Sequence, residues 1–282
     1  MKNVGIYIKR SKPEAGAAAR QLINWLERRG LTPMVPQAEA EMYGLPDGRP
    51  VEEVFGTCDL LIVLGGDGTF LAASRLLTGR QAPVLGVNLG GMGFMTEVRL
   101  HEVPETLDLL LENKLRIIKR SRLRVEVWAN AERQEYQVLN DAVLTKRALA
   151  RIFDLRISVG GNFLNTVRAD GLIVATPTGS TAYNLAAGGP IVHPQAQVLI
   201  ITPICPHMLT DRPIVVPADR VVEIELVDEV DVFVTCDGQE GRELHMGDRM
   251  QIAASPDPLL LIKSHKRSYF DVLREKLHYG ER

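Results

Sequence analysis

The spacing of the apolar residues changes near Lys119, and this change restricts the possible folds more than any other feature of the sequence. Ahead of that point, continuous apolar runs at residues 59–64 and 83–87 alternate with helical patterns such as residues 13–29. Continuous apolar runs are typical of strands buried on both faces of a parallel sheet. The alternation of strands and helices therefore predicts a Rossmann-like α/β domain with a doubly wound parallel sheet and right-handed crossovers.

Beyond Lys119 the apolar residues instead alternate with polar ones over short stretches, as at residues 122–128 and 221–226. Such period-two stretches, separated by turn signals like the Gly-Gly-Asn sequence at residues 160–162, are typical of antiparallel sheets. The sequence thus predicts an all-β domain over residues 119–262.

A helical pattern returns at residues 268–279. We expect this C-terminal helix to dock back on the first domain, which would then comprise residues 1–118 and 263–282. No long linker separates the two predicted domains, so the crevice between them is the expected ligand site.

Charge and cysteine content exclude several classes of protein. The 282 residues include 33 Lys and Arg against 35 Asp and Glu, which gives a net charge of −2. A chain with this balance has no overall positive field to attract nucleic acid or anionic lipid, so we expect neither as a partner. The three cysteines lack the spacing of zinc ligands, and so sparse a set suits a reducing compartment.

The N-terminal residues are interrupted by charges at Lys2, Lys9 and Arg10, so they do not have the pattern of a secretory signal. No apolar stretch approaches the roughly 18–20 residues of a membrane helix. We therefore expect a cytoplasmic protein without a membrane partner.

A Gly-Gly-Asp-Gly-Thr sequence at residues 65–69 lies between a buried strand pattern and a helical pattern. Glycines let a backbone approach a ligand closely, and the first turn of a helix offers unpaired N–H groups to an anion. The position therefore predicts a phosphate-binding loop. It is not a Walker A loop, which needs a lysine. It is also not a complete dinucleotide fingerprint, because Leu71 stands where the last glycine is required.

Asp67 is the unusual residue of this loop, because an ionised carboxylate repels the phosphates that the loop attracts. The residue makes chemical sense if it handles a proton or a metal ion; alternatively, it caps the helix that follows. A second glycine cluster at residues 86–94 follows the next predicted strand, and we expect both turns to line one edge of the sheet. The alternative for that cluster is a flexible connection.

Two polar features stand out in the β-rich half. Asn140 and Asp141 interrupt an apolar strand pattern, either as a clamp for a ribose diol or as a β-bulge or turn. Further on, an apolar strand leads into Thr-Pro-Thr-Gly-Ser-Thr at residues 176–181, and a helix is expected from Thr181. A helix N-cap accounts for one hydroxyl of this sequence but not for four. Tyr183 is placed to stack on an adenine ring.

Together these sequences closely resemble the bacterial NAD kinase family, in order and in spacing. The resemblance rests on residues 65–69, 140–141, 170–183 and 188–190, and it extends over nearly the whole chain. The 170–183 stretch is highly specific, whereas the glycine loop also occurs in diacylglycerol kinases, sphingosine kinases and 6-phosphofructokinases. The resemblance implies transfer of the terminal phosphate of ATP, with Mg²⁺ or another divalent cation, to the 2′-hydroxyl of the adenosine ribose of NAD.

The resemblance also implies roles for individual residues. Asp67 would be the general base that faces the ribose hydroxyl. Asn140 and Asp141 would clamp the ribose and adenosine, and Asp170 would contact the nicotinamide end. The other residues expected to contact the two nucleotides are Gly65, Gly66, Gly68, Thr69, Arg151, Arg168, Ser180, Thr181, Ala182, Tyr183, Asn184, Leu185, Ala186 and Gln239. Among these, residues 181–183 would line the adenine side.

Three further expectations come from the resemblance. The β-rich domain would bind the dinucleotide, the protein itself would supply no metal site, and the chain would assemble as a homodimer or homotetramer. Two positions depart from the family pattern: Asp141 stands where relatives often have Glu, and Asn184 begins an Asn-Leu-Ala sequence where relatives often have Ser-Leu-Ser.

Two other functions are compatible with parts of the sequence. A lipid kinase of the diacylglycerol type would share residues 65–69 but would be expected to show an apolar or basic membrane-facing surface, of which the sequence gives no sign. A non-catalytic dinucleotide sensor would need the clamp at residues 140–141 but not Asp67.

Overall fold

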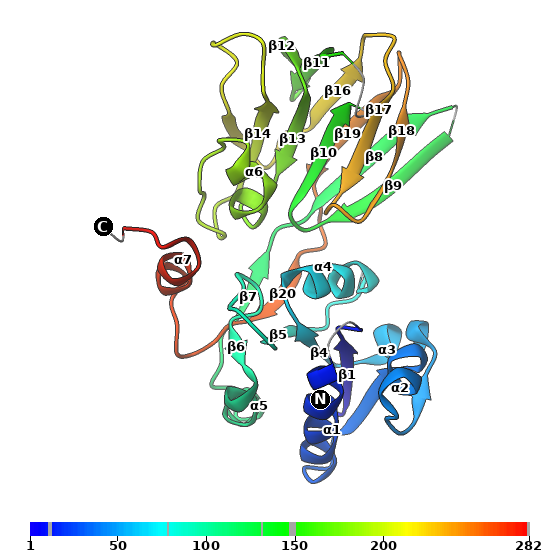
Figure 1. Cartoon of the computed structure of the whole chain (residues 1–282), viewed down its shortest axis with the longest axis vertical. Helices are drawn as coiled ribbons and strands as arrows, with labels where there is room; N and C mark the ends of the chain where they lie inside the picture. Colours follow the sequence, from blue (N-terminus) through cyan, green and yellow to red (C-terminus); the bar gives the residue numbers. More distant parts are fainter. Residues whose placement is uncertain (11–12, 78, 131, 147–150, 281–282) are drawn as a thin grey trace. The chain divides into compact units, whose positions relative to one another are not determined.

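The computed structural model describes residues 1–10, 13–77, 79–130, 132–146 and 151–280, and these residues divide into two compact units (Figure 1). The first unit combines both ends of the chain, Met1–Lys119 and Leu259–Arg282, and the second unit comprises Arg120–Pro258. The two units differ in their strand pairing, as the change in apolar periodicity predicts.

The first unit is built on an eight-stranded sheet with the order β3-β2-β1-β4-β5-β20-β7, in which β6 also pairs with β5. The strands are β1 (Asn3–Ile8), β2 (Thr32–Pro36), β3 (Gly48–Arg49), β4 (Leu60–Gly65), β5 (Val84–Asn88), β6 (Val98–Arg99), β7 (Ile117–Arg120) and β20 (Leu259–Ile262). Strands β1 to β6 pair in parallel, and β20 pairs in parallel with β5. The predicted Rossmann-like parallel sheet is therefore confirmed, and its two central strands, β4 and β5, are buried along their whole length.

Helices follow most of these strands. They are α1 (Pro13–Glu27), α2 (Gln37–Tyr43), α3 (Val51–Thr57), α4 (Asp67–Leu76), the 3₁₀-helix η1 (Leu100–Glu102), α5 (Val103–Leu111) and α7 (Tyr269–Leu277). The C-terminal helix α7 belongs to the first unit, as predicted. It begins with a capping box, in which the Ser268 hydroxyl accepts a hydrogen bond from the Asp271 N–H and the Asp271 carboxylate accepts one from the Ser268 N–H.

The second unit contains two six-stranded antiparallel sheets, which confirms the predicted all-β half (Figure 1). One sheet has the order β15-β14-β13-β10-β17-β18 and the other β12-β11-β16-β19-β8-β9. The first sheet consists of β10 (Asp141–Lys146), β13 (Gly171–Ala175), β14 (Val198–Ile204), β15 (Ile214–Pro217), β17 (Val232–Cys236) and β18 (Glu240–Leu244). The second consists of β8 (Leu123–Ala129), β9 (Glu132–Val138), β11 (Phe153–Val159), β12 (Asn162–Ala169), β16 (Val222–Leu226) and β19 (Arg249–Ala254).

Alternate residues of both sheets meet in one apolar core, which includes Phe153, Leu172 and Ile252. The predicted hairpin between β11 and β12 is present. Gly160 and Gly161 form its two-residue loop with positive φ angles of 58° and 78°, the combination that a type I′ turn requires and that glycine adopts without strain.

The helix expected from Thr181 is present, but it begins two residues later and is short. The chain forms a 3₁₀ turn, η2 (Gly179–Thr181), and then a single helical turn, α6 (Tyr183–Ala186). Ala182 leaves the helical region between them, with ψ −133°, and Gly188 has a φ of 82° that ends the turn. The buried side chain of Asn184 holds this compact conformation by donating to the carbonyls of Ser180 and Pro190, at 3.1 and 3.2 Å.

Within the described residues, no helix combines the length and the apolar character that crossing a bilayer requires.

Candidate active site

Asp67 is the first residue of α4, but it does not cap its own helix; Gly66 occupies the N-cap position without a side-chain bond. The Asp67 carboxylate instead accepts hydrogen bonds from the loop that follows β5. Oδ2 accepts from the Phe94 N–H at 2.9 Å, and Oδ1 accepts from the N–H groups of Met95 and Thr96 at 3.1 and 3.2 Å and from the Thr96 hydroxyl at 3.1 Å. Of the two explanations offered by the sequence, helix capping is therefore not observed.

These bonds join the ends of two neighbouring parallel strands. The second glycine cluster is therefore a braced turn rather than a flexible connection, and the Asn88 amide supports it from within by donating to the Gly91 carbonyl at 2.5 Å. Each carboxylate oxygen has two lone pairs, so Oδ1 is saturated by its three donors, while Oδ2, with one, can still accept. Asp67 is half-buried, and Oδ2 is the oxygen through which it can engage a substrate hydroxyl.

The other members of the glycine loop leave its backbone accessible. Gly65 is buried, and a Cβ there would collide with the Thr69 side chain, whereas Cβ atoms at Gly66 and Gly68 would meet open space. The backbone at Gly66 and Gly68 is open to an anion, and phosphate binding by this loop stays a prediction.

In the second unit, four of the predicted binding residues line one pocket of about 360 Å³. They are Asn140, Asp141, Ala182 and Tyr183, which contribute to the lining together with residues of β10 and β17 and with the turn after β17. The pocket pairs an exposed aromatic ring with an amide and carboxylates. Such a surface can stack on a flat base and hydrogen-bond a sugar.

Asn140 and Asp141 occupy the point at which the chain changes sheets. Strand β9 ends at Val138 in one sheet and β10 begins at Asp141 in the other, so the polar pair forms a turn as well as part of the pocket. The backbone of these residues therefore forms the turn that was one of the two alternatives. The turn leaves the side chains able to bind a ligand.

Asp237 lines the same pocket, and the sequence analysis missed it as a site residue. Its Oδ1 accepts from the Asn140 and Asp141 N–H groups at 2.7 and 3.4 Å, and its Oδ2 accepts from the Leu139 N–H at 3.0 Å. The only signal was the Asp-Gly turn at residues 237–238. Nothing in the local pattern shows that the Asp237 side chain anchors a turn 97 positions away in the sequence.

Two buried carboxylates therefore meet in this pocket. Burial, and secondly the negative charge of Asp237, raise the pKa of Asp141 from its ordinary 3.8 to about 7. In its protonated form Asp141 can donate a hydrogen bond as well as accept one.

The hydroxyl-rich stretch before α6 contacts residues 139–140, next to the pocket. The Thr176 hydroxyl donates to the Leu139 carbonyl at 2.6 Å, and the Thr176 N–H donates to the Asn140 carbonyl at 2.8 Å. Gly179 packs so closely on Asn140 that a Cβ would collide with the Asn140 carbonyl. These contacts show that the Thr176 hydroxyl and Gly179 support residues 139–140.

Ser180 and Asn184, both predicted to bind a nucleotide, direct their polar groups into the protein. The buried Ser180 hydroxyl contacts the carbonyls of Pro177 and Val192 at 2.7 and 3.2 Å. The Asn184 carbonyl oxygen accepts from the Thr202 hydroxyl at 2.7 Å. Neither residue is in the pocket lining, and the same holds for their neighbours Thr181, Leu185 and Ala186.

The remaining predicted residues also lie outside that lining. Arg151 is exposed before β11, and Gln239 is exposed in the turn between β17 and β18. Arg168 lies on β12, with its Nε 3.8 Å from a carboxylate oxygen of Asp154. Asp170 forms an ion pair with Lys146, with 2.6 Å between Oδ1 and Nζ. Nucleotide contacts by these residues stay predictions.

The close packing around Asp67 gives a direct test of the loop. A Cβ at Gly93 would collide with the Asp67 carboxylate and the Thr96 hydroxyl, whereas a Cβ at Gly91 would meet open space. We expect Gly93→Ala to lower the free energy of unfolding by ~1–3 kcal/mol through this overpacking. Gly91→Ala, in the same loop, should change it by less than about 0.5 kcal/mol. Urea denaturation of both variants measures the difference, and equal stabilities would contradict the close contact.

The raised pKa of Asp141 gives a prediction for pH. Between about pH 4 and pH 7 the folded state keeps a proton on Asp141 that the unfolded state has lost, so wild-type stability falls as the pH rises through this window. Asp141→Asn removes this titration. The free energy of unfolding of the variant, relative to wild type, should therefore rise from pH 4 to pH 7 and be constant above pH 7. Thermal unfolding of both proteins across this pH range measures the difference. The exposed control Asp219→Asn should show no such trend, and a pH-independent difference for Asp141→Asn would contradict the raised pKa.

Comparisons with known proteins identify the family of this chain. Residues 4–115 match the family model of the ATP-NAD kinase N-terminal domain, and residues 139–264 match that of the ATP-NAD kinase C-terminal domain. Among curated proteins, the chain is 46% identical to the NAD kinase of Geotalea daltonii and 45% identical to that of Geobacter sulfurreducens, in each case over the full length of both chains.

Solved structures show the same fold. The yeast NADH kinase complexed with NADH superposes with a TM-score of 0.94 at 27% identity, covering all of this chain and 89% of that one. An NAD kinase from Archaeoglobus fulgidus in complex with ATP gives a TM-score of 0.79 at 25% identity, covering 99% of this chain and all of the other. With both domain models matched and relatives more than 40% identical over their whole length, the chain belongs to the NAD kinase family.

Proposed function

We propose that this chain transfers the terminal phosphate of ATP to the 2′-hydroxyl of the adenosine ribose of NAD, giving NADP and ADP. The observation that carries the proposal is Asp67, a carboxylate fixed in a phosphate-loop position with one oxygen still able to accept a proton. The curated relatives are named NAD kinases, and the similar solved structures contain NADH and ATP, which supports both substrates.

In this proposal Asp67 acts as the general base. A ribose hydroxyl is a weak nucleophile, and its proton must leave as the new bond to phosphorus forms. Asp67 Oδ2 would accept that proton, while the N–H groups that hold Oδ1 keep the carboxylate in place. The rest of phosphoryl transfer depends on alignment and charge neutralisation, which the backbone of residues 65–69 would provide for the phosphates.

The divalent cation would arrive with ATP. Hard cations such as Mg²⁺ prefer oxygen ligands, which the phosphates of ATP supply, so the proposal needs no preformed metal site in the protein. When bound, the ion would offset the negative charge of the donor phosphates.

The second unit would bind the dinucleotide. The pocket of Asn140, Asp141, Tyr183 and Asp237 offers a stacking surface beside groups that can both donate and accept hydrogen bonds, as adenosine requires. A lipid acceptor has neither a base to stack nor a ribose diol to clamp, and the matches to both NAD kinase domains argue against the lipid-kinase alternative. A cytoplasmic location and assembly into dimers or tetramers complete the proposal.

The proposed reaction is tested by incubating the protein with ATP, Mg²⁺ and NAD and measuring NADP. Parallel reactions with other nucleotides or polyphosphate as donor, and with NADH as acceptor, define its range. Diacylglycerol as the acceptor tests the lipid alternative. Binding of NAD without formation of NADP would indicate a sensor instead.

Replacement of the proposed base gives a kinetic prediction. Asp67→Asn should lower kcat by ~10²-fold or more, because general-base catalysis typically contributes 10²–10⁴-fold. Circular dichroism must show that the variant is folded, since Asn cannot accept all the hydrogen bonds that Asp67 accepts. Asp219→Asn, whose side chain is 75% exposed, is the matched control and should keep wild-type kcat. A folded Asp67→Asn protein with near wild-type turnover would exclude Asp67 as the base.

Stacking on the adenine ring predicts a different pattern. Tyr183→Ala should raise the KM for NAD more than it lowers kcat, because a stacking contact stabilises the bound substrate and the transition state alike. Steady-state kinetics with NAD as the varied substrate measure both constants. Tyr279→Ala removes another exposed aromatic ring outside the pocket and should leave both unchanged. An unaltered KM in Tyr183→Ala would remove Tyr183 from the binding site.

A further inference from the structure

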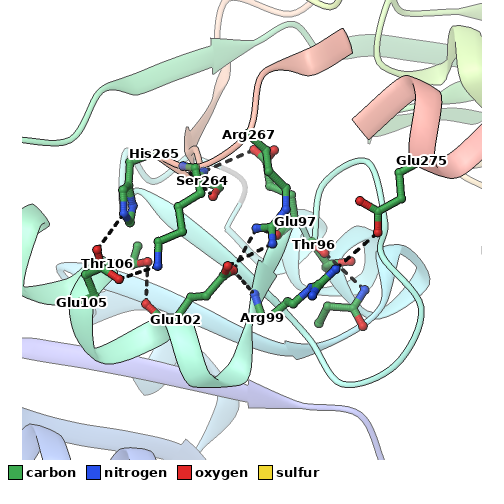
Figure 2. Close-up of polar contacts among 12 residues, drawn as sticks. Thr96, Glu97, Arg99, Glu102, Glu105, Thr106, Ser264, His265, Arg267 and Glu275 are labelled. Atoms are coloured by element: carbon green, nitrogen blue, oxygen red, sulfur yellow. Dashed lines mark hydrogen bonds and ion pairs between the residues drawn. The ribbon is translucent and has the colours of Figure 1, made fainter. Parts of the chain in front are cut away.

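A cluster of ion pairs joins the C-terminal segment, residues 263–267, to the chain just beyond the loop that binds Asp67 (Figure 2). At its centre is Arg267. Its Nη1 donates to Glu102 Oε2 at 2.9 Å and to the Glu97 carbonyl at 3.2 Å, and its Nη2 donates to Glu102 Oε1 at 3.0 Å. One guanidinium thus holds a carboxylate with two parallel bonds and a backbone carbonyl with a third.

Burial makes this arrangement strong. The side chains of Arg267 and Glu102 are only 15% and 5% exposed, so little solvent screens them. Hydrogen bonds from Arg267 and from the Arg99 N–H, the latter at 2.8 Å, outweigh the effect of burial and lower the pKa of Glu102 to about 2. Glu102 is therefore ionised, and the pair intact, throughout the pH range in which an enzyme of this kind works.

The contact leads directly to Asp67. Thr96 donates two hydrogen bonds to the Asp67 carboxylate, and the next residue, Glu97, is the one whose carbonyl Arg267 holds. The Glu97 carboxylate also accepts from the Ser264 N–H at 3.4 Å. A shift of Glu97 would move the Thr96 N–H and hydroxyl, and with them the donors that orient Asp67.

We propose that Arg267 and Glu102 are positioning residues for catalysis: they fix the Thr96–Glu97 segment so that the Asp67 carboxylate keeps the orientation needed to accept the ribose proton. This inference rests on the proposed role of Asp67. It differs from a purely structural role, in which the pair would only fasten the C-terminal segment to the first unit and catalysis would be indifferent to it.

The same segment supplies a matched control. Glu105 accepts from Lys266 Nζ at 2.5 Å and lies 3.0 Å from His265 Nε2, but its side chain is 54% exposed and neither of these pairs includes a residue of the 94–97 segment. Glu105→Gln therefore removes ion pairs of the C-terminal segment without disturbing the Arg267 contact. Exposed pairs of this type contribute little to stability.

The experiment is a double-mutant cycle between Arg267→Met and Asp67→Asn. Alone, Arg267→Met should lower kcat by ~10-fold or more, with the KM for NAD within about two-fold of wild type, because misplacement of a catalytic group affects the transition state. In the Asp67→Asn background it should lower kcat further by less than about two-fold, since the group that it positions is already lost. Glu105→Gln should match wild type.

Because Arg267→Met leaves the Glu102 charge buried without its guanidinium, the variant could fail to fold. The double variant Glu102→Gln with Arg267→Met removes both charges and should show the same kcat loss with a smaller loss of stability. Hydrogen exchange gives a readout independent of turnover. The amides of Phe94, Met95 and Thr96 should exchange faster than in wild type in either variant, and at the wild-type rate in Glu105→Gln.

Three results would overturn the inference: wild-type kcat in a folded variant, an equal loss of kcat in the wild-type and Asp67→Asn backgrounds, or an equal loss in Glu105→Gln. The absence of NADP formation by the wild-type protein would instead overturn the proposed function, and the catalytic role of the pair with it. The assay of the wild-type protein alone reveals this outcome, so it is distinguished from a failure of the inference about Arg267 and Glu102.

Discussion

The hydrogen bonds that the Asp67 carboxylate accepts from residues 94–96 are the interaction on which the first unit's candidate site depends. An ionised carboxylate is electrostatically unfavourable beside the phosphates that this loop attracts. Charge-assisted hydrogen bonds from three backbone N–H groups offset the unfavourable electrostatic energy. The same bonds use the N–H groups of residues 94–96, so this part of the turn after β5 orients the carboxylate. The backbone of residues 65–69 is the predicted place for phosphate groups.

The periodicity of the sequence was sufficient to predict the architecture, because a change from buried parallel strands to half-buried antiparallel ones alters which positions are apolar. The strand expected at residues 59–64 is Leu60–Gly65, and that expected at 221–226 is Val222–Leu226. The helix expected from Thr181 begins only at Tyr183 and has a single turn. The carbonyl oxygen of Asn184, a residue that reads as an ordinary helical position, is engaged by Thr202, and such tertiary contacts override local preference.

The candidate site was predictable to the extent that its residues are close in sequence. Asn140, Asp141, Ala182 and Tyr183 belong to motifs that can be read locally, and they meet in one pocket. Asp237 could not be found in this way, because its binding of the 139–141 backbone depends on the pairing of strands β10 and β17, which are distant in sequence. Burial of Asp141, and secondly the charge of Asp237, raise the pKa of the Asp141 carboxyl. A neutral acid can hydrogen-bond a substrate as a donor.

The first unit is completed by the end of the chain, and this has a consequence for the loop that holds Asp67. Strand β20 pairs beside β5, and the segment after it brings Arg267 to the Glu97 carbonyl, 170 positions away in sequence. A loop rich in glycine has many conformations open to it, so the orientation of Asp67 cannot follow from the loop sequence alone. It follows instead from contacts at both ends of residues 88–97: Asn88 within the turn, and Arg267 with Glu102 beyond it. The orientation of Asp67, within a motif of five consecutive residues, thus depends on Asn88, Glu102 and Arg267. No local sequence pattern connects these side chains to the motif.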